Sequence, residues 1–256
     1  MRAGFLGRFS VADLTTLALA APMGGVPTWS TTAGELFRAF EELVGAMVGD
    51  YALFDYTDLG FVDPRSDLRT IGPRRPDVVL LAEKTSVDFL VREVAAHYGI
   101  SSLILGGQPA LVVTECLVRA LLEVHRGDVT VVAYVDYDYS GDIVARAFCK
   151  QLARYGVAVS RLGFLVRPER FTREELRAWA HVIAPRRVSD RGKLRAWLKA
   201  GGGIDGRAYG IGSDHFRGID RLCAAFEEEV GEAIIDASSR GRAAIRRAGG
   251  PHPQQD

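Results

Sequence analysis

Two carboxylates one residue apart follow a run of apolar residues near the middle of the chain. The segment from Val129 to Asp142 reads VTVVAYVDYDYSGD, in which Asp136 and Asp138 stand where a buried strand is expected to end. Like charges this close raise each other's pKa unless a cation or a hydrogen-bond donor offsets them. The pair therefore predicts either two side chains that splay into water or a site that holds something positive.

A third acidic residue, Glu83, directly follows the apolar run VVLLA about 50 residues earlier, with another predicted strand-helix unit in between. Functional groups collect at the carboxyl ends of strands in open α/β sheets, so we expect Glu83, Asp136 and Asp138 to converge if their strands are neighbours. Oxygen-only clusters suit Mg²⁺, or Mn²⁺ in its place, bound through a few carboxylates, waters and a substrate phosphate. Either feature alone is weak evidence, because strand-end glutamates are usually solvated and D-x-D pairs also occur in sugar-nucleotide transferases and ordinary turns.

The elements that must position these residues alternate regularly after Asp77. Short apolar runs predict strands at 78–82, 101–105, 129–135 and 157–165, and amphipathic segments between them predict helices at 86–99, 110–125 and 142–156. Such alternation predicts right-handed βαβ crossovers and an α/β fold with a mostly parallel sheet covered by helices on both faces. Further helices are expected at 172–184, 190–200 and 216–236.

Two local expectations concern the start of the helix after the D-x-D pair. Gly141 is expected to allow a close approach of backbone or ligand to the edge of the sheet. Asp142 is expected to cap this helix rather than bind a ligand, because a carboxylate is favoured at a helix N-terminus.

The N-terminal region is less regular. It is expected to be small and mostly helical, with candidate helices at 10–20 and 33–49. We place a boundary in the connector PRSDLRTIGPRRPD, which is rich in proline and arginine. The predicted organisation is an N-terminal region at 1–73, a main domain with a helical extension at 74–236, and a disordered basic tail at 237–256.

The net charge of zero conceals an asymmetry along the chain. Residues 1–145 contain 11 basic and 19 acidic residues, whereas residues 146–256 contain 21 basic and 13 acidic residues. Between Arg146 and Lys199 there are 14 basic and 4 acidic residues. A basic stretch beside an acidic strand edge is typical of a phosphate-backbone binder with a metal site, and it makes Arg186 and Arg187 candidate phosphate contacts. The same excess also fits the solvated helix faces of an arginine-rich protein.

Composition disfavours several other classes of protein. No apolar run reaches the length of a membrane span, and Asp13 interrupts the approach to a short N-terminal apolar patch, so a cytoplasmic protein without a signal peptide is expected. The three cysteines are far apart and lack C-x-x-C spacing, which favours buried reduced thiols over zinc or disulfides. Among the histidines only His215, in the segment GSDHFRG, is expected near the substrate, and a structural role is favoured for it too.

The motifs VVLLAEK, LILGGQP and VVAYVDYDYSGD together resemble the Toprim domain of topoisomerases, bacterial primases and several nucleases. They look closest to the A subunit of type IIB topoisomerases (topoisomerase VI) and the related meiotic double-strand-break proteins. The resemblance covers roughly 74–232 and is strongest over 78–165. It implies a Toprim-like, Rossmannoid parallel sheet.

The resemblance also implies roles for individual residues. Glu83, Asp136 and Asp138 become catalytic residues that bind Mg²⁺ next to the scissile phosphate, with Glu83 a candidate general acid or base. Lys84 and Gln108 become candidate phosphate or DNA contacts, and Gln108 shapes the loop beside the site together with Gly106 and Gly107.

Two departures from the family pattern stand out. Tyr139 follows the second aspartate, where the family usually has proline. Topoisomerases of this type also use a nucleophilic tyrosine in a winged-helix domain, and residues 1–73 are long enough only for a reduced remnant of one. No Arg-Asp-x-Tyr-Tyr sequence is present, and Tyr51 and Tyr56 are weak candidates for the nucleophile.

These observations lead to one main hypothesis and two alternatives. The main hypothesis is an Mg²⁺-dependent DNA-processing enzyme that cleaves or rearranges phosphodiesters, either with metal-activated water or with the help of a partner. The resemblance adds DNA, a homodimer and an ATPase or other partner subunit as interaction partners. The first alternative is a non-catalytic DNA-binding or regulatory module. The second is a metal-dependent sugar-nucleotide transferase, which explains D-x-D but not Glu83-Lys84 or the GGQP turn. The sequence leaves DNA and RNA open as substrates.

Overall fold

The chain divides into two compact units, Met1–Pro64 and Arg65–Asp256. The computed structural model describes residues 44, 47, 48, 55–63, 66–107, 109–185 and 187–231. In the first unit, Val44, Met47 and Val48 are helical, in agreement with the helix expected there. The predicted helix at 10–20 and the predicted tail at 237–256 lie outside the described residues.

The second unit contains a five-stranded sheet in the order β1-β3-β2-β4-β5. All neighbouring strands are parallel except β1, which pairs antiparallel with β3. The mostly parallel α/β fold predicted from the sequence is therefore confirmed. The strands are β1 (Arg69–Thr70), β2 (Arg75–Ala82), β3 (Ile100–Ile104), β4 (Val129–Tyr134) and β5 (Val159–Phe164).

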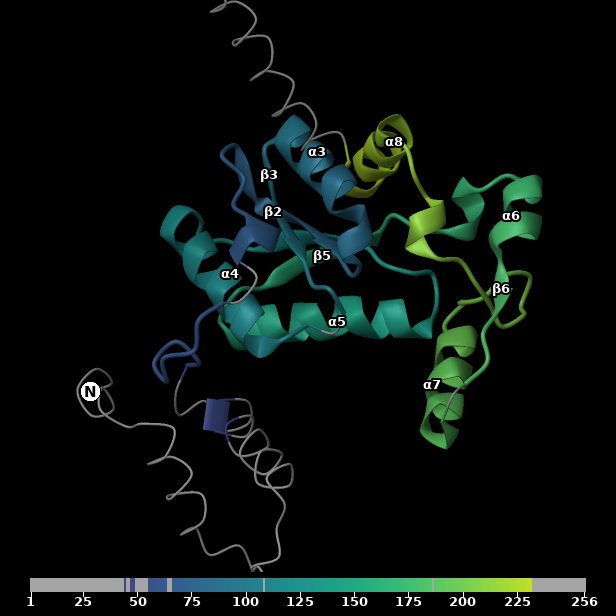
Figure 1. Cartoon of the computed structure of the whole chain (residues 1–256), viewed down its shortest axis with the longest axis horizontal. Coiled ribbons are helices and arrows are strands. Elements are labelled where there is room, and N and C mark those ends of the chain that lie inside the picture. The colour runs from purple at the N-terminus through teal and green to yellow at the C-terminus, as the bar shows by residue number, and fades with distance from the viewer. Residues whose placement is uncertain are drawn as a thin grey trace, which may run out of the picture. The chain divides into compact units, whose positions relative to one another are not determined.

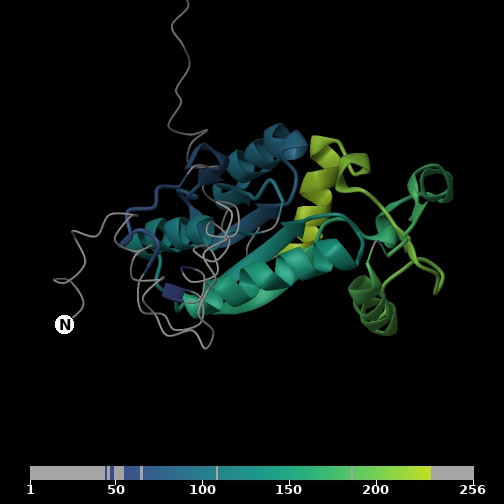
Figure 2. The same ribbon diagram turned by 60° about the horizontal axis from the view of Figure 1, so that its bottom comes forward.

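Helices cover both faces of this sheet. Figure 1 shows α3 and α8 on one face and α4 and α5 on the other, and the rotated view agrees (Figure 2). Alternate residues of β2 divide between the two cores: Val78 and Leu80 pack on the side of α3 and α8, whereas Val79 and Leu81 pack on the side of α4 and α5. The helices are α3 (Asp88–Tyr98), α4 (Leu111–Val124), α5 (Tyr139–Arg154) and α8 (Ile219–Val230).

A smaller extension lies beyond one edge of the sheet, in the same place in both views (Figures 1 and 2). It consists of α6 (Arg173–Trp179), β6 (His181–Val182), α7 (Val188–Lys199) and β7 (Tyr209–Gly210). The single helix predicted for 172–184 is wrong after Trp179, because β6 pairs antiparallel with β7. Pro185 disfavours helical backbone at the residue before it, and Ile183 N instead donates to Ala208 O.

The connector predicted between the two regions contributes to the sheet. It contains β1, and Gly72 lies against the backbone of β3, where a Cβ atom would come 2.3 Å from the carbonyl carbon of Ile100. Glycine is required here because any side chain would collide with that strand.

The structure also bears on two expectations from composition. Cys116, Cys149 and Cys223 are free thiols, as predicted, but each is partly exposed rather than fully buried. Within the described ranges, no helix has the length and apolar character needed to cross a bilayer.

Candidate functional site

The register of the sheet brings the ends of β2 and β4 together. Ala82 lies opposite Tyr134 in adjacent parallel strands, so Glu83 and Asp136 follow neighbouring strands at the same edge. Gly107 N donates to Glu83 O over 3.0 Å, and Gly106 and Gly107 both have positive φ angles. The glycine turn thus lies directly beside Glu83, as expected, while Gln108 lies outside the described residues.

Glu83 has the least satisfied carboxylate in this region. Its Oε2 atom is buried and has no hydrogen-bond partner among the described residues. Burial raises the pKa of Glu83, and the nearby charges of Asp136 and Asp138 raise it further, against an opposing effect of Lys84. A buried carboxylate oxygen without a partner is costly. This observation favours a cation or a proton donor as the missing partner.

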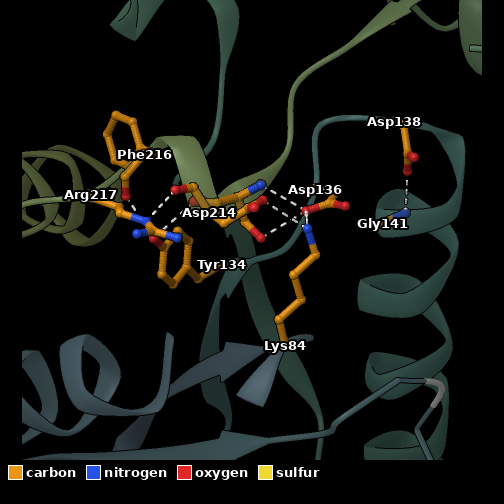
Figure 3. Close-up of polar contacts among 9 residues, drawn as sticks. Lys84, Tyr134, Asp136, Asp138, Gly141, Asp214, Phe216 and Arg217 are labelled. Carbon is orange, nitrogen blue, oxygen red and sulfur yellow. Dashed lines mark hydrogen bonds and ion pairs between the residues drawn. The ribbon is translucent and has the colours of Figure 1, made fainter. Parts of the chain in front are cut away.

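Asp136 accepts three contacts on one oxygen. The backbone N and the hydroxyl of Ser213 each donate to Oδ1 over 2.7 Å, and Lys84 Nζ lies 2.8 Å from it. Lys84 also reaches Asp214 Oδ1 at 2.9 Å, so its ammonium group bridges two aspartates (Figure 3). Burial lowers the pKa of Lys84, but its hydrogen bonds to Asp136 and Asp214 outweigh this and leave the pKa raised. The hydrogen bond from Lys84 holds the pKa of Asp214 below its usual value.

Asp138 has a different partner. It is the N-cap of α5, and its Oδ1 accepts a 2.8 Å hydrogen bond from Gly141 N. Figure 3 shows this side chain directed toward the helix rather than toward Lys84. The prediction that Asp142 caps the helix is wrong, because α5 begins at Tyr139 and Asp142 instead pairs with Arg146. Asp138 therefore stabilises the helix N-terminus through the hydrogen bond that defines a cap.

The residues around Asp138 explain two further features of the motif. Gly141 allows a close backbone approach, as predicted: a Cβ atom there would lie 2.1 Å from Asp136 O. Tyr139 occupies the first helical position, which is also where proline is well tolerated. Both tyrosine and proline are thus compatible with this helix start.

Three residues that contribute to the site were missed by the sequence analysis. Ser213 and Asp214 belong to the GSDHFRG segment, which Tyr134 holds against the end of β4. The buried Tyr134 Oη lies 3.0 Å from Ser213 O and 2.6 Å from Phe216 O. His215, the residue singled out in that segment, instead stacks on Trp179 with ring centroids 5.4 Å apart, in agreement with a structural role.

Replacing Tyr134 by phenylalanine should loosen this segment. The variant leaves two buried carbonyl groups without the hydroxyl donor, which is expected to cost about 2 kcal/mol of unfolding free energy. For a domain of this size, that corresponds to a fall in Tm of roughly 4–8 °C. Thermal unfolding followed by circular dichroism measures it. The matched control is Tyr209→Phe on β7, and equal shifts in the two variants would contradict the prediction.

Two hollows lie next to the carboxylates. One of about 450 Å³ is lined by Glu83, Lys84, Thr85, Ser86, Gly106 and Gly107. A second, of about 390 Å³, is lined by Asp136 and Asp138 together with Arg167 and the end of α7. The predicted site residues are therefore accessible, but they open into two neighbouring spaces.

The remaining candidates are not brought to the strand ends by any described contact. Arg187 is exposed before the start of α7, whereas the opposite end of that helix lines the second hollow. Arg186 and Tyr51 lie outside the described residues. Tyr56 belongs to the first unit, where its ring packs edge-on against Phe61 at 5.3 Å.

The fit of the predicted metal can be judged from these donors. Among the described residues, no group of three or more His, Cys, Asp or Glu side chains forms a ready-made metal site. The donor set still suits Mg²⁺, because it contains only oxygens and includes the unpartnered Glu83 Oε2. The contacts to Asp136 all fall on Oδ1, which leaves its Oδ2 for a ligand.

Comparisons with protein-family models, with curated proteins and with solved structures found no match to this chain. The fold and site define its class: an α/β domain with an acidic site at the carboxyl ends of two adjacent parallel strands.

Proposed function

We propose that the chain is an Mg²⁺-dependent DNA-processing enzyme of the Toprim class, which cleaves or rearranges phosphodiester bonds in the manner of topoisomerase VI A subunits. One observation carries the proposal: Glu83 and Asp136 follow adjacent parallel strands, and the buried Glu83 Oε2 has no partner among the described residues. Parallel sheets commonly bind their ligands at this edge.

In this proposal Glu83, Asp136 and Asp138 hold the ion. Bound Mg²⁺ supplies positive charge to the phosphate and leaving oxygens of the substrate. Lys84, which otherwise bridges Asp136 and Asp214, is close enough to contact a phosphate in the hollow that it lines. Glu83 lines the same hollow and is placed to accept or donate a proton there.

A plasmid assay tests the proposal. Supercoiled DNA incubated with the protein is expected to become nicked, linear or relaxed in Mg²⁺ or Mn²⁺ but not in EDTA. Asp136→Asn should lower the rate roughly a hundredfold or more, because it removes a charge that holds the ion. The matched control is Asp128→Asn, an exposed residue before the opposite end of β4. An inactive wild type, or equal activity in both variants, would contradict the proposal.

A second candidate function is a non-catalytic DNA-binding module. The observation that favours it is that Lys84 already neutralises Asp136 and that Asp138 already caps α5, so both aspartates have structural partners without any ion. This candidate predicts DNA binding that Asp136→Asn leaves unchanged, together with no metal-dependent change in the plasmid.

A further inference from the structure

Helix α7 carries a row of basic residues on one ridge. Arg191, Arg195 and Lys199 are spaced four residues apart along the helix, so their side chains are neighbours on its surface, and Arg187 directly precedes the helix. All four are exposed. Among the described residues, none of the four forms an ion pair or a hydrogen bond through its side chain. Their charges are therefore available to an external partner.

Several other arginines of the basic stretch are already paired. Arg170 pairs with Glu228 and Glu229, and Arg167 also reaches Glu229. Arg146 pairs with Asp142. These arginines are already paired with carboxylates, whereas α7 carries three exposed basic residues of the stretch in one row.

The outward surface of α7 between these charges is made of small residues. Ser189, Gly192 and Ala196 are exposed, and a Cβ atom at Gly192 would meet no atom within 4 Å. Leu194 is the buried residue of the helix, and Val188 is its one large apolar residue in the open, at the first position. A helix that lies in a membrane surface needs a broad apolar face, which α7 does not present. A polyanion backbone can instead approach the small residues closely.

The C-terminal end of the row lies beside the hollow that Asp136 and Asp138 line. Trp197, near the end of α7, packs against Tyr137 with ring centroids 5.3 Å apart. Trp197, Ala200 and Gly201 line the same hollow as Asp136 and Asp138. A polyanion bound along α7 would therefore reach the strand-end site.

We propose that α7 is the surface through which this protein holds duplex DNA, by sequence-independent contacts between its basic row and one phosphate backbone. The proposal rests on the proposed function and names how its substrate is bound. Arg191 and Lys199, the first and last helical residues of the row, lie about 12 Å apart along the helix axis. One DNA strand carries a phosphate about every 3.4 Å of its axis, so several phosphates lie within reach of the row.

The test measures DNA affinity as a function of salt. Fluorescence anisotropy with a labelled 30-bp duplex in EDTA compares the wild type with the triple variant Arg191→Gln, Arg195→Gln and Lys199→Gln. The dissociation constant of the variant should rise at least tenfold. The slope of log K against log salt should fall by about 0.9 for each phosphate that the variant no longer neutralises, or roughly 2–3 in all.

A matched control changes three exposed basic residues on other elements: Arg126→Gln, Lys150→Gln and Arg161→Gln. Its dissociation constant is expected to stay within twofold of the wild type. A second variant separates binding from folding: Gly192→Glu replaces a poor helix former, so the helix should not be weakened, yet the added negative charge should reduce DNA affinity. Gly192→Gln should bind DNA like the wild type.

The outcomes distinguish this inference from the proposed function. If the triple variant binds DNA with the affinity and salt slope of the wild type, the α7 proposal is overturned, even if Mg²⁺-dependent cleavage is present. If α7 controls binding but the wild type never alters plasmid DNA, the α7 proposal stands and the enzymatic function fails. The proposal would also be overturned if the triple variant lost binding to vesicles of anionic phospholipid that the wild type binds, while its DNA binding stayed unchanged.

Discussion

Replacement of Arg170 by methionine is expected to lower the unfolding free energy by about 3–5 kcal/mol, the range for removing one partner of a buried ion pair. The Arg170 side chain is only 11% exposed and its Nη2 atom lies 2.8 Å from Glu229 Oε1, in a carboxylate that is 4% exposed. It also donates to Phe164 O over 2.7 Å and Leu165 O over 2.9 Å. The variant therefore leaves a buried charge and two carbonyl groups without their main donor.

In the variant, the Glu229 carboxylate cannot easily move into water to avoid being buried without its partner. A Cβ atom at Gly163 would lie 2.5 Å from Glu229 Oε2, so the carboxylate packs directly on β5. Arg167 remains 3.1 Å away, but its side chain is 42% exposed and replaces only part of the interaction. The expected loss is therefore about 3 kcal/mol, the lower end of this range.

Urea and thermal unfolding measure this effect. A loss of about 3 kcal/mol corresponds to a fall in Tm of roughly 6–12 °C for a domain of this size. The control is Arg177→Met, an exposed arginine of α6, which should unfold like the wild type. The double variant Arg170→Met with Glu229→Leu should recover much of the loss, because no charge then stays buried. Equal unfolding of the Arg170 and Arg177 variants would refute the argument.

Much of the sheet could be predicted from the sequence because its strands are buried on both faces. Such strands appear as continuous apolar runs, and VVLLA and VTVVAY are recognisable as strands for that reason. Helix ends that carry a strong sequence signal, such as a C-terminal glycine, could also be predicted. Gly99 ends α3 with φ +66, which only glycine adopts readily.

The start of α5 shows where local patterns stop being sufficient. Asp136, Asp138 and Asp142 all precede or begin a helix, and each is a good capping residue by type. Which of them caps the helix depends on where β4 ends, and the end of β4 is set by its pairing with β2 and β5. The local pattern favours Asp142, whereas the sheet leaves Asp138 at the N-cap.

The partners of Asp136 illustrate the same limit over a longer distance. Ser213 lies 77 residues from Asp136 in the chain, and no spacing rule connects them. The contact exists because the hydroxyl of Tyr134 fixes the segment that contains Ser213 at the end of β4. A tyrosine at that position looks like an ordinary strand residue in the sequence, so neither its hydrogen bonds nor Asp214 could be foreseen.

Replacement of Lys84 by methionine should make the stability of the protein depend strongly on divalent ions. Lys84 is the cation that bridges Asp136 and Asp214, and Glu83 lies next to it in the chain. Without it, these carboxylates repel one another in a partly buried site. In EDTA the variant is expected to lose about 1–2 kcal/mol of unfolding free energy relative to the wild type.

Addition of Mg²⁺ should then stabilise the folded state of the variant more than that of the wild type. Removal of one positive charge next to the ligand oxygens is expected to tighten Mg²⁺ binding roughly tenfold. A ligand that binds only the folded state raises Tm by mass action, so the Tm gain in excess Mg²⁺ should be larger for Lys84→Met. Calorimetry and thermal unfolding measure both effects, with Lys150→Met, an exposed lysine of α5, as the control. If Lys84→Met and Lys150→Met respond equally to Mg²⁺, the acidic residues at these strand ends do not form a metal site.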